Sequence, residues 1–283
     1  MKKITALFIV ILVSLTIFNL KSTRSGGEVF EVIADEKISP IKLLVKDDFG
    51  SIKSNLWKLS SSSITSKTNN LRKFLELNTS LWENELNLGY QSADGLASLS
   101  VDNSKLGLWQ YSNLTPECDI SLKTDCYNNN PSKLLSLAYA QKLIKVTTGS
   151  YDTFDFSFED GENLLKISAT KVIADTSTPL TWEFFFGEFD SKLLLISAYG
   201  FLASLDKGPM VKTLSSAETA EYLSQRSNYI SGKILEAKFK RSLSLVYAKD
   251  GTIWLAPSYT FFVNKVIFTE LALPDTVAKR VTS

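Results

Sequence analysis

Alternation of hydrophobic and polar residues marks the last third of the chain as antiparallel β structure. In segment 235–247, hydrophobic residues occupy most odd positions and charged or hydroxyl residues most even ones, which predicts a half-buried strand. Lys249-Asp250-Gly251 is typical of a hairpin turn, and further strands are expected over 252–262 and 265–273. Just upstream, Ser215-Ser216-Ala217-Glu218 has the residues of a capping box, so a short helix is predicted to begin there.

The same order of a helix followed by strands is predicted twice more upstream. In the middle of the chain, Ser132 is placed to cap a helix over 133–146, and Gly149 is placed to end it. In the first third, segment 60–70 (SSSSITSKTNN) is typical of a flexible polar loop, and a short helix is expected at 71–77. The strands expected in these regions are 81–91, 96–101, 106–112, 153–158, 164–174, 180–189 and 192–201, with edge strands at 29–34 and 41–45.

These elements predict an α+β protein in which short helices pack on antiparallel sheets, in repeated helix-plus-meander units. The repetition has two explanations, a duplicated unit or similar hairpins that arose independently. The expected division is 1–25 as a membrane segment, 28–130 as an N-terminal α+β unit with the Ser-rich loop 60–70, 131–212 as a middle unit and 213–275 as a C-terminal unit.

The N-terminus has the charge and hydropathy of a membrane segment. Lys2 and Lys3 precede the mostly apolar run 4–20, which as a helix reaches about 25 Å, slightly less than a ~30 Å hydrocarbon core. The run fits an uncleaved signal-anchor, a cleaved signal peptide or, less well, a buried core helix. A signal-anchor is preferred because no small-residue cleavage site follows. The body is then expected outside the cytoplasm, held at the cell membrane by a single pass, or secreted if the segment is cleaved.

Cys118 and Cys126 are the two cysteines of the chain, and both stand in a polar segment. A disulfide between them is expected to stabilise the fold by about 2.5 kcal/mol through restriction of the unfolded chain. It agrees with an oxidising compartment. The alternatives are two unpaired thiols or half of a metal site, which no further Cys or His is present to complete.

The composition excludes several classes of function. The 283 residues contain no histidine, which rules out Ser-His-Asp and Cys-His catalysis and every His-ligated metal site. After Gly27 the chain carries 27 basic and 30 acidic residues, so it lacks the basic surplus of a nucleic-acid binder. Neither G-x-G-x-x-G nor a P-loop occurs. We therefore expect no cofactor, no metal, no nucleic-acid partner and no nucleotide.

Acidic residues are the remaining candidates for chemistry, and their spacing does not favour an enzyme. Region 152–162 is rich in Asp and Glu but lacks the alternate spacing of an EF-hand, so it predicts an acidic strand edge rather than a calcium site. Glu183 and Glu188, five residues apart in one strand, point to opposite faces and cannot form the carboxylate pair of a glycosidase. No Ser-x-x-Lys stands at a strand-to-helix turn. We therefore expect no catalytic residues.

The aromatic strand over 180–189 is the clearest candidate for binding. Its aromatic residues lie on both faces, so both faces need cover. That cover is either the protein's own helices or a second sheet, or else a partner, a dimer mate or a lipid-like ligand. The candidate apolar ligand or partner surface consists of Trp182, Phe184, Phe186, Trp254 and Tyr259.

Three segments carry a resemblance to a known group of proteins. They are LTWEFFFGEFDSKLLLISAYGFLASLDKG (180–208), LSSAETAEYL (214–223) and KDGTIWLAPSY (249–259). In this order they resemble uncharacterised secreted or anchored actinobacterial cell-envelope proteins with PepSY-like helix-plus-sheet units. The resemblance covers roughly 71–273, and the missing N-terminal cysteine departs from the lipoprotein members. It implies a non-enzymatic binding or regulatory ectodomain and assigns no functional residue.

The function expected from the sequence is a membrane-tethered extracytoplasmic binding or regulatory module of the cell envelope, without catalytic chemistry. The alternative is a carrier for a hydrophobic, lipid-like ligand on a curved antiparallel sheet. The expected partners are the membrane, through the N-terminal helix, and an envelope protein or lipid.

Overall fold

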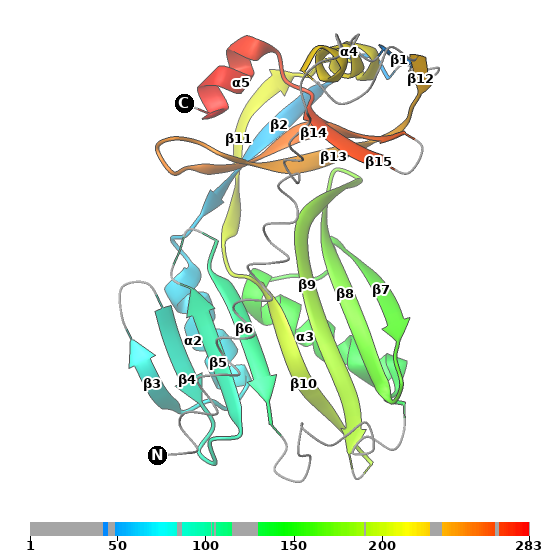
Figure 1. Cartoon of the computed structure of the whole chain (residues 1–283). Coiled ribbons are helices and arrows are strands. Elements are labelled where there is room, and N and C mark those ends of the chain that lie inside the picture. The colour runs from blue at the N-terminus through cyan, green and yellow to red at the C-terminus, as the bar shows by residue number, and fades with distance from the viewer. Residues whose placement is uncertain are drawn as a thin grey trace, which may run out of the picture. The chain divides into compact units, whose positions relative to one another are not determined.

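The computed structural model describes residues 42–44, 49–83, 87–102, 104, 106–114, 130–189, 191–226, 234–263 and 266–282. Within these residues, antiparallel strands dominate and four helices pack on them (Figure 1). All of the elements lie in one contact unit, residues 40–283. The α+β class predicted from the sequence is therefore confirmed.

An eight-stranded antiparallel sheet forms the larger part of the fold. Its two halves are meanders that meet where β6 pairs with β10, with Tyr111 opposite Ala198. In spatial order the strands are β3 (Thr79–Glu83), β4 (Asn87–Gln91), β5 (Ala97–Asp102), β6 (Leu108–Asn113), β10 (Lys192–Phe201), β9 (Thr176–Phe189), β8 (Leu164–Ile173) and β7 (Phe154–Asp160).

Two helices cover one face of this sheet, α2 (Ile64–Phe74) and α3 (Lys133–Thr148) (Figure 1). Each precedes one of the two meanders in the chain, so the order of a helix followed by four strands occurs twice. Tyr139 of α3 bridges the layers through edge-to-face contacts, with ring centroids 5.5 Å from Phe74 and 5.9 Å from Phe186. The hydrophobic core lies between these helices and the sheet.

A second, five-stranded sheet combines strands from both ends of the chain. β14 (Ile253–Val263) pairs with β13 (Lys238–Tyr247) on one side and with β2 (Lys53–Ser60) and β15 (Val266–Leu271) on the other. β11 (Ser204–Lys212) pairs with β2. The short strands β1 (Lys42–Leu44) and β12 (Ile234–Glu236) form a separate parallel pair.

Two further helices pack on the five-stranded sheet. Ala220 and Leu223 of α4 (Ser216–Arg226) share a core cluster with Tyr259 and Phe261 of β14. Val281 of α5 (Asp275–Thr282) lies in another core cluster together with Ala256 of β14. Ala256 stands at an even position of the strand and Tyr259 and Phe261 stand at odd positions, so they point to opposite faces. β14 is therefore buried on both sides, which explains its almost continuous hydrophobic sequence.

Local signals in the sequence predicted the helix ends well. In the predicted capping box, the Glu218 amide donates to Ser215 Oγ at 3.1 Å and the Ser215 amide donates to Glu218 Oε2 at 2.7 Å. Helix α3 begins after Ser132, and its C-cap Gly149 has φ 91°, a left-handed conformation that glycine adopts without strain. The strand predicted at 192–201 has the bounds of β10.

Two local predictions were wrong. The Ser-rich loop expected at 60–70 contains the first two turns of α2, because Ile64, Thr68 and Leu71 recur on one side of a helix and are buried there. The single strand expected at 81–91 is divided into β3 and β4, which pair with each other. The sheets also cross the expected unit boundaries, since β2 and β11 join the strands of the 213–275 region.

Several predictions fall outside the described residues. The membrane segment 1–25, the edge strand at 29–34, and Cys118 and Cys126 all lie there. The membrane segment and the disulfide therefore stay predictions. Among the helices of the described ranges, none is both long and apolar enough to cross a membrane.

Candidate functional site

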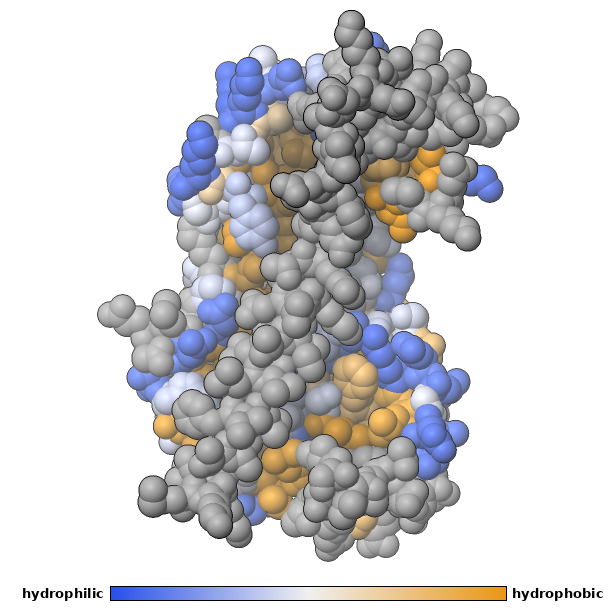
Figure 2. Space-filling view, viewed as in Figure 1, coloured by the Kyte–Doolittle hydropathy of each residue, from blue (hydrophilic) through white to orange (hydrophobic). Residues whose placement is uncertain are grey.

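The face of the eight-stranded sheet opposite α2 and α3 carries a group of polar side chains beside a hydrophobic part. Along β8 and β9 the alternate residues, such as Ile167 and Phe184, are buried toward the helices, so their neighbours in sequence point the other way. Figure 2 looks onto this side and shows hydrophobic residues gathered over the lower ends of β9 and β10. We define the polar face as Ser98, Ser100, Gln110, Ser112, Lys166, Ser168, Thr170, Thr181, Glu183, Ser197 and Tyr199.

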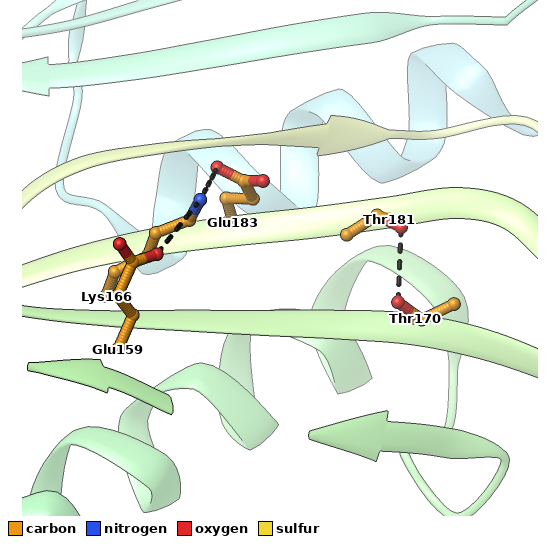
Figure 3. Close-up of polar contacts among 5 residues, drawn as sticks. All are labelled: Glu159, Lys166, Thr170, Thr181 and Glu183. Carbon is orange, nitrogen blue, oxygen red and sulfur yellow. Dashed lines mark hydrogen bonds and ion pairs between the residues drawn. The ribbon is translucent and has the colours of Figure 1, made fainter. Parts of the chain in front are cut away.

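An ion-pair network stands in the middle of the polar face (Figure 3). Lys166 Nζ on β8 lies 3.0 Å from Glu183 Oε2 on β9 and 3.8 Å from Glu159 Oε2 on β7. The Glu183 side chain is 19% exposed and that of Lys166 28%, whereas Glu159 is 77% exposed. Lys166 and Glu183 thus form a half-buried pair, to which Glu159 adds a weak surface contact.

Tyr199 completes this network from the neighbouring strand β10. It stands directly opposite Glu183 in the antiparallel register, so the two side chains are neighbours on one face of the sheet. Burial, and then the adjacent carboxylate, raise the pKa of Tyr199 because both disfavour the phenolate. The phenol therefore stays a neutral donor at physiological pH, beside one cation and one anion.

Hydroxyl pairs extend the polar face on both sides of the network. Thr170 Oγ1 and Thr181 Oγ1 are 3.2 Å apart, and Ser98 Oγ and Ser112 Oγ are 3.0 Å apart (Figure 3 for the threonines). Each pair joins directly opposed residues of adjacent strands. Since a hydroxyl both donates and accepts, every pair keeps hydrogen-bonding capacity for another molecule.

Three of the acidic residues considered in the sequence, Glu159, Asp160 and Glu183, form ion pairs in the described structure. Asp160 on β7 accepts from Lys133 Nζ at 2.7 Å, which ties the start of α3 to the sheet edge. No group of three or more Asp, Glu, Cys or His residues in the described part of the chain is placed to hold a metal ion. The geometry of these residues indicates no catalytic role.

The predicted aromatic residues are covered by the chain itself. Phe184 and Phe186 are fully buried, and Trp182 is 3% exposed, with its ring centroid 5.0 Å from that of Phe154. Tyr259 is buried in the separate cluster beneath α4, and Trp254 is half-buried beside α5. The structure therefore does not bring the five residues together on one surface. Among the possible ways of covering these aromatic residues, the structure shows packing beneath the protein's own helices.

One cavity that the described residues line gives no support to the carrier function. It lies between Ser54, Thr176, Arg241 and Tyr259 among others and holds about 40 Å³. A site for a drug-sized or lipid-like ligand needs roughly 300 Å³ or more. This cavity therefore accommodates one or two water-sized groups and no acyl chain.

The residues that the structure groups most closely could not be found from the sequence. Lys166 and Tyr199 meet Glu183 through strand register, for which no local signal exists. Lys67 on α2 lies beside Ser204, 137 residues further along the chain. Ser63 and Lys67 are four residues apart, a spacing typical of one side of a helix, but the composition of this segment predicts a loop.

Comparison with known proteins gives distant likenesses of structure alone. No family model and no curated protein matches the chain. An uncharacterised protein from Eubacterium rectale is similar at 10% identity and TM-score 0.44, over 84% of this chain and 88% of that one. YycH from Bacillus subtilis is similar at 13% identity and TM-score 0.37, over 78% of this chain and 52% of YycH. The YpeB C-terminal domain from Bacillus megaterium is similar at 10% identity and TM-score 0.30, over 74% and 92%.

These likenesses bring no function to the chain. This chain spans about half of YycH, and all three identities are very low. The helix-plus-sheet units implied by the PepSY-like resemblance are present in the structure itself. The actinobacterial origin stays a prediction.

Proposed function

We propose that this protein is an extracytoplasmic binding or regulatory module that holds an envelope protein or another envelope component on its polar face. The observation that carries the proposal is the network of Lys166, Glu183 and Tyr199 at the centre of that face. It offers a cation, an anion and a neutral donor within one small area.

Stability alone gives little reason for such a network. The desolvation of two half-buried charges offsets much of their attraction, so the pair adds little net free energy of folding. If stability were the only requirement, hydroxyl residues like those elsewhere on the polar face could replace the three side chains on a solvent-exposed sheet. Tyr199 has a raised pKa, and groups with perturbed titration collect at functional sites, which favours recognition of a ligand beside it.

The proposed location rests on the sequence. The apolar run after Lys2 and Lys3 favours a membrane tether, and the two cysteines favour an oxidising compartment. A regulatory role follows from the same placement, because a body held at the membrane acts on other molecules through what it binds.

Site-specific crosslinking in the organism that encodes the chain tests this function. A photoreactive residue placed at Ser100 or Gln110, both exposed on the polar face, is expected to capture a discrete partner. The matched control is Asn69, which is exposed on α2 and therefore on the covered side of the sheet. Equal capture from Asn69, or none from either face position, would contradict the proposal.

A charge exchange separates recognition from folding. In the double variant Lys166→Glu/Glu183→Lys the ion pair is kept but reversed, so the free energy of unfolding should stay close to that of the wild type. Capture from Gln110 should fall at least about tenfold, since the charge pattern presented to the partner is inverted. Unchanged capture by a folded double variant would exclude the network from binding.

A further inference from the structure

A serine, a lysine and a second serine meet where β10 passes into β11. Ser204 is the first residue of β11, and its Oγ lies 2.9 Å from Lys67 Nζ and 2.6 Å from Ser63 Oγ. Lys67 Nζ also donates to the carbonyl oxygen of Leu202 at 2.8 Å. Ser63 is the N-cap of α2, and Lys67 follows one helical turn later, so both side chains lie on the same side of that helix.

In the structure, Lys67 Nζ donates to Ser204 Oγ and to the Leu202 carbonyl oxygen. The same contacts can be kept when the amine loses one proton. A neutral amine has two N–H groups and one lone pair, so it can donate to the Leu202 carbonyl and accept the proton of Ser204. The Ser204 oxygen can then accept from the Ser63 hydroxyl. This order points the lone pair of the lysine at the serine hydroxyl, which is the geometry of a base beside its nucleophile.

The surroundings ease the loss of a proton from the amine. Ile64 and Leu202, which flank the cluster in sequence, are buried. Burial lowers the pKa of Lys67, because desolvation disfavours the ammonium form. Ser63, Lys67 and Ser204 are themselves half-buried, so the cluster is not closed off from solvent.

We propose that Ser204 is a nucleophile that Lys67 activates, and that this site takes activated acyl groups such as carboxylic esters. In the reaction, the bond from Ser204 Oγ to the acyl carbon forms and the carbon–oxygen bond to the leaving alcohol breaks. The Ser204 proton passes to Lys67 Nζ and from there to the leaving oxygen. The proposal goes beyond the binding function of the polar face, which needs no bond-forming residue.

The start of α2 supplies donors for the negative charge that develops in this step. The first amides of a helix have no partner within the helix. The Ile64 amide donates to the Ser61 carbonyl oxygen at 3.1 Å, whereas Ser63 makes no side-chain bond to the amides of Thr65 and Ser66. These two amides lie in the first turn after Ser63, whose hydroxyl contacts the nucleophile. The partial positive charge of a helix N-terminus also favours an oxyanion there.

A serine-reactive fluorophosphonate, applied to the full chain, tests the site. In labelling, the bond from Ser204 Oγ to phosphorus forms, fluoride leaves, and Lys67 takes the proton. We expect one adduct per chain by intact mass, located on Ser204 by peptide mapping and absent from Ser204→Ala. With p-nitrophenyl acetate, a burst of about one equivalent of p-nitrophenolate is expected.

Two variants separate the chemistry from a structural role. Lys67→Arg keeps a cationic donor for Leu202 but cannot take up a proton, so labelling should slow about 100-fold or more at an unchanged thermal midpoint. Ser62→Ala is the matched control and should label like the wild type. Ser62 is exposed and its Oγ lies 3.0 Å from Ser60 Oγ, with no lysine in that pair.

Three outcomes would overturn the proposal. They are no adduct on the folded wild type, an adduct that forms equally fast on Lys67→Arg, and labelling that is spread over Ser60, Ser62 and Ser204 alike. Because the first is measured on the unmodified protein, the test does not depend on the folding of any variant.

Discussion

Gly200 on β10 lies directly against the indole of Trp182, and this contact allows a quantitative test of the core. A Cβ added at Gly200 would stand 2.0 Å from Trp182 Cδ1 and 2.5 Å from Nε1, far inside van der Waals contact. The indole cannot retreat easily, since its ring centroid is 5.0 Å from that of Phe154 and 5.7 Å from that of Phe201. Gly200→Ala must therefore displace packed aromatic rings or the strand itself.

We expect Gly200→Ala to lower the free energy of unfolding by about 3 kcal/mol. Overpacking a well-filled core costs roughly 1–3 kcal/mol, and an overlap with a ring held from two sides belongs at the upper end. The matched control is Gly161→Ala, where the nearest atom to the new Cβ is the Leu164 carbonyl oxygen at 3.5 Å. That change should stay within about 0.5 kcal/mol of the wild type.

Urea unfolding followed by tryptophan fluorescence and circular dichroism measures both variants, and a double-mutant cycle assigns the cause. Trp182→Ala removes Cγ, Cδ1 and Nε1, the three indole atoms that the new Cβ would meet. It loses no hydrogen bond, because Nε1 has no partner among the described residues. In that background Gly200→Ala should cost about 1–2 kcal/mol less than alone. Equal stability of Gly200→Ala and Gly161→Ala, or strict additivity in the cycle, would refute the packing argument.

Three further predictions follow from the polar contacts. Ser215→Ala should destabilise the protein by about 1 kcal/mol in urea unfolding, and Ser132→Ala by less, since the Ser132 hydroxyl lies 3.5 Å from its amide donor. The raised pKa of Tyr199 means that its neutral phenol stabilises the fold below the usual tyrosine pKa of 10.0, and this contribution is lost as the pH rises further. Tyr199→Phe should therefore lose less stability than the wild type in alkaline urea titrations; an equal loss would contradict the assignment. Lys166→Met, which leaves the half-buried Glu183 unpaired, should be roughly 1 kcal/mol less stable than Lys166→Met/Glu183→Gln, and the reverse order would contradict the pairing.

Elements defined by local contacts could be predicted from the sequence. The capping box at Ser215 and the helix that follows Ser132 depend on residues three or four positions apart. The start of α2 was missed because its serines and asparagines resemble a loop in composition. The burial of Ile64, Thr68 and Leu71 outweighs that composition in the folded chain.

Elements defined by distant pairing could not be predicted in this way. β2 and β11 lack a clear alternation, and their pairing places Ser60 opposite Ser204. The candidate site has the same origin: Glu183 was compared with Glu188 in its own strand, whereas its partners Lys166 and Tyr199 come from neighbouring strands. A sequence gives the residues of a strand but not the register that decides which of them meet.

The seam between β6 and β10 has a consequence for synthesis of the protein. The first meander ends at Asn113, and the strand that covers its open edge is complete only at Phe201, about 90 residues later. At a translation rate of about 5–20 residues per second, β6 stays an unpaired edge for roughly 4–18 s. During this interval the backbone groups of β6 can pair with another nascent chain. Expression of this protein should therefore depend on chaperones that hold unfolded chains. This dependence should be stronger than for proteins whose sheet edges are covered by strands nearby in sequence.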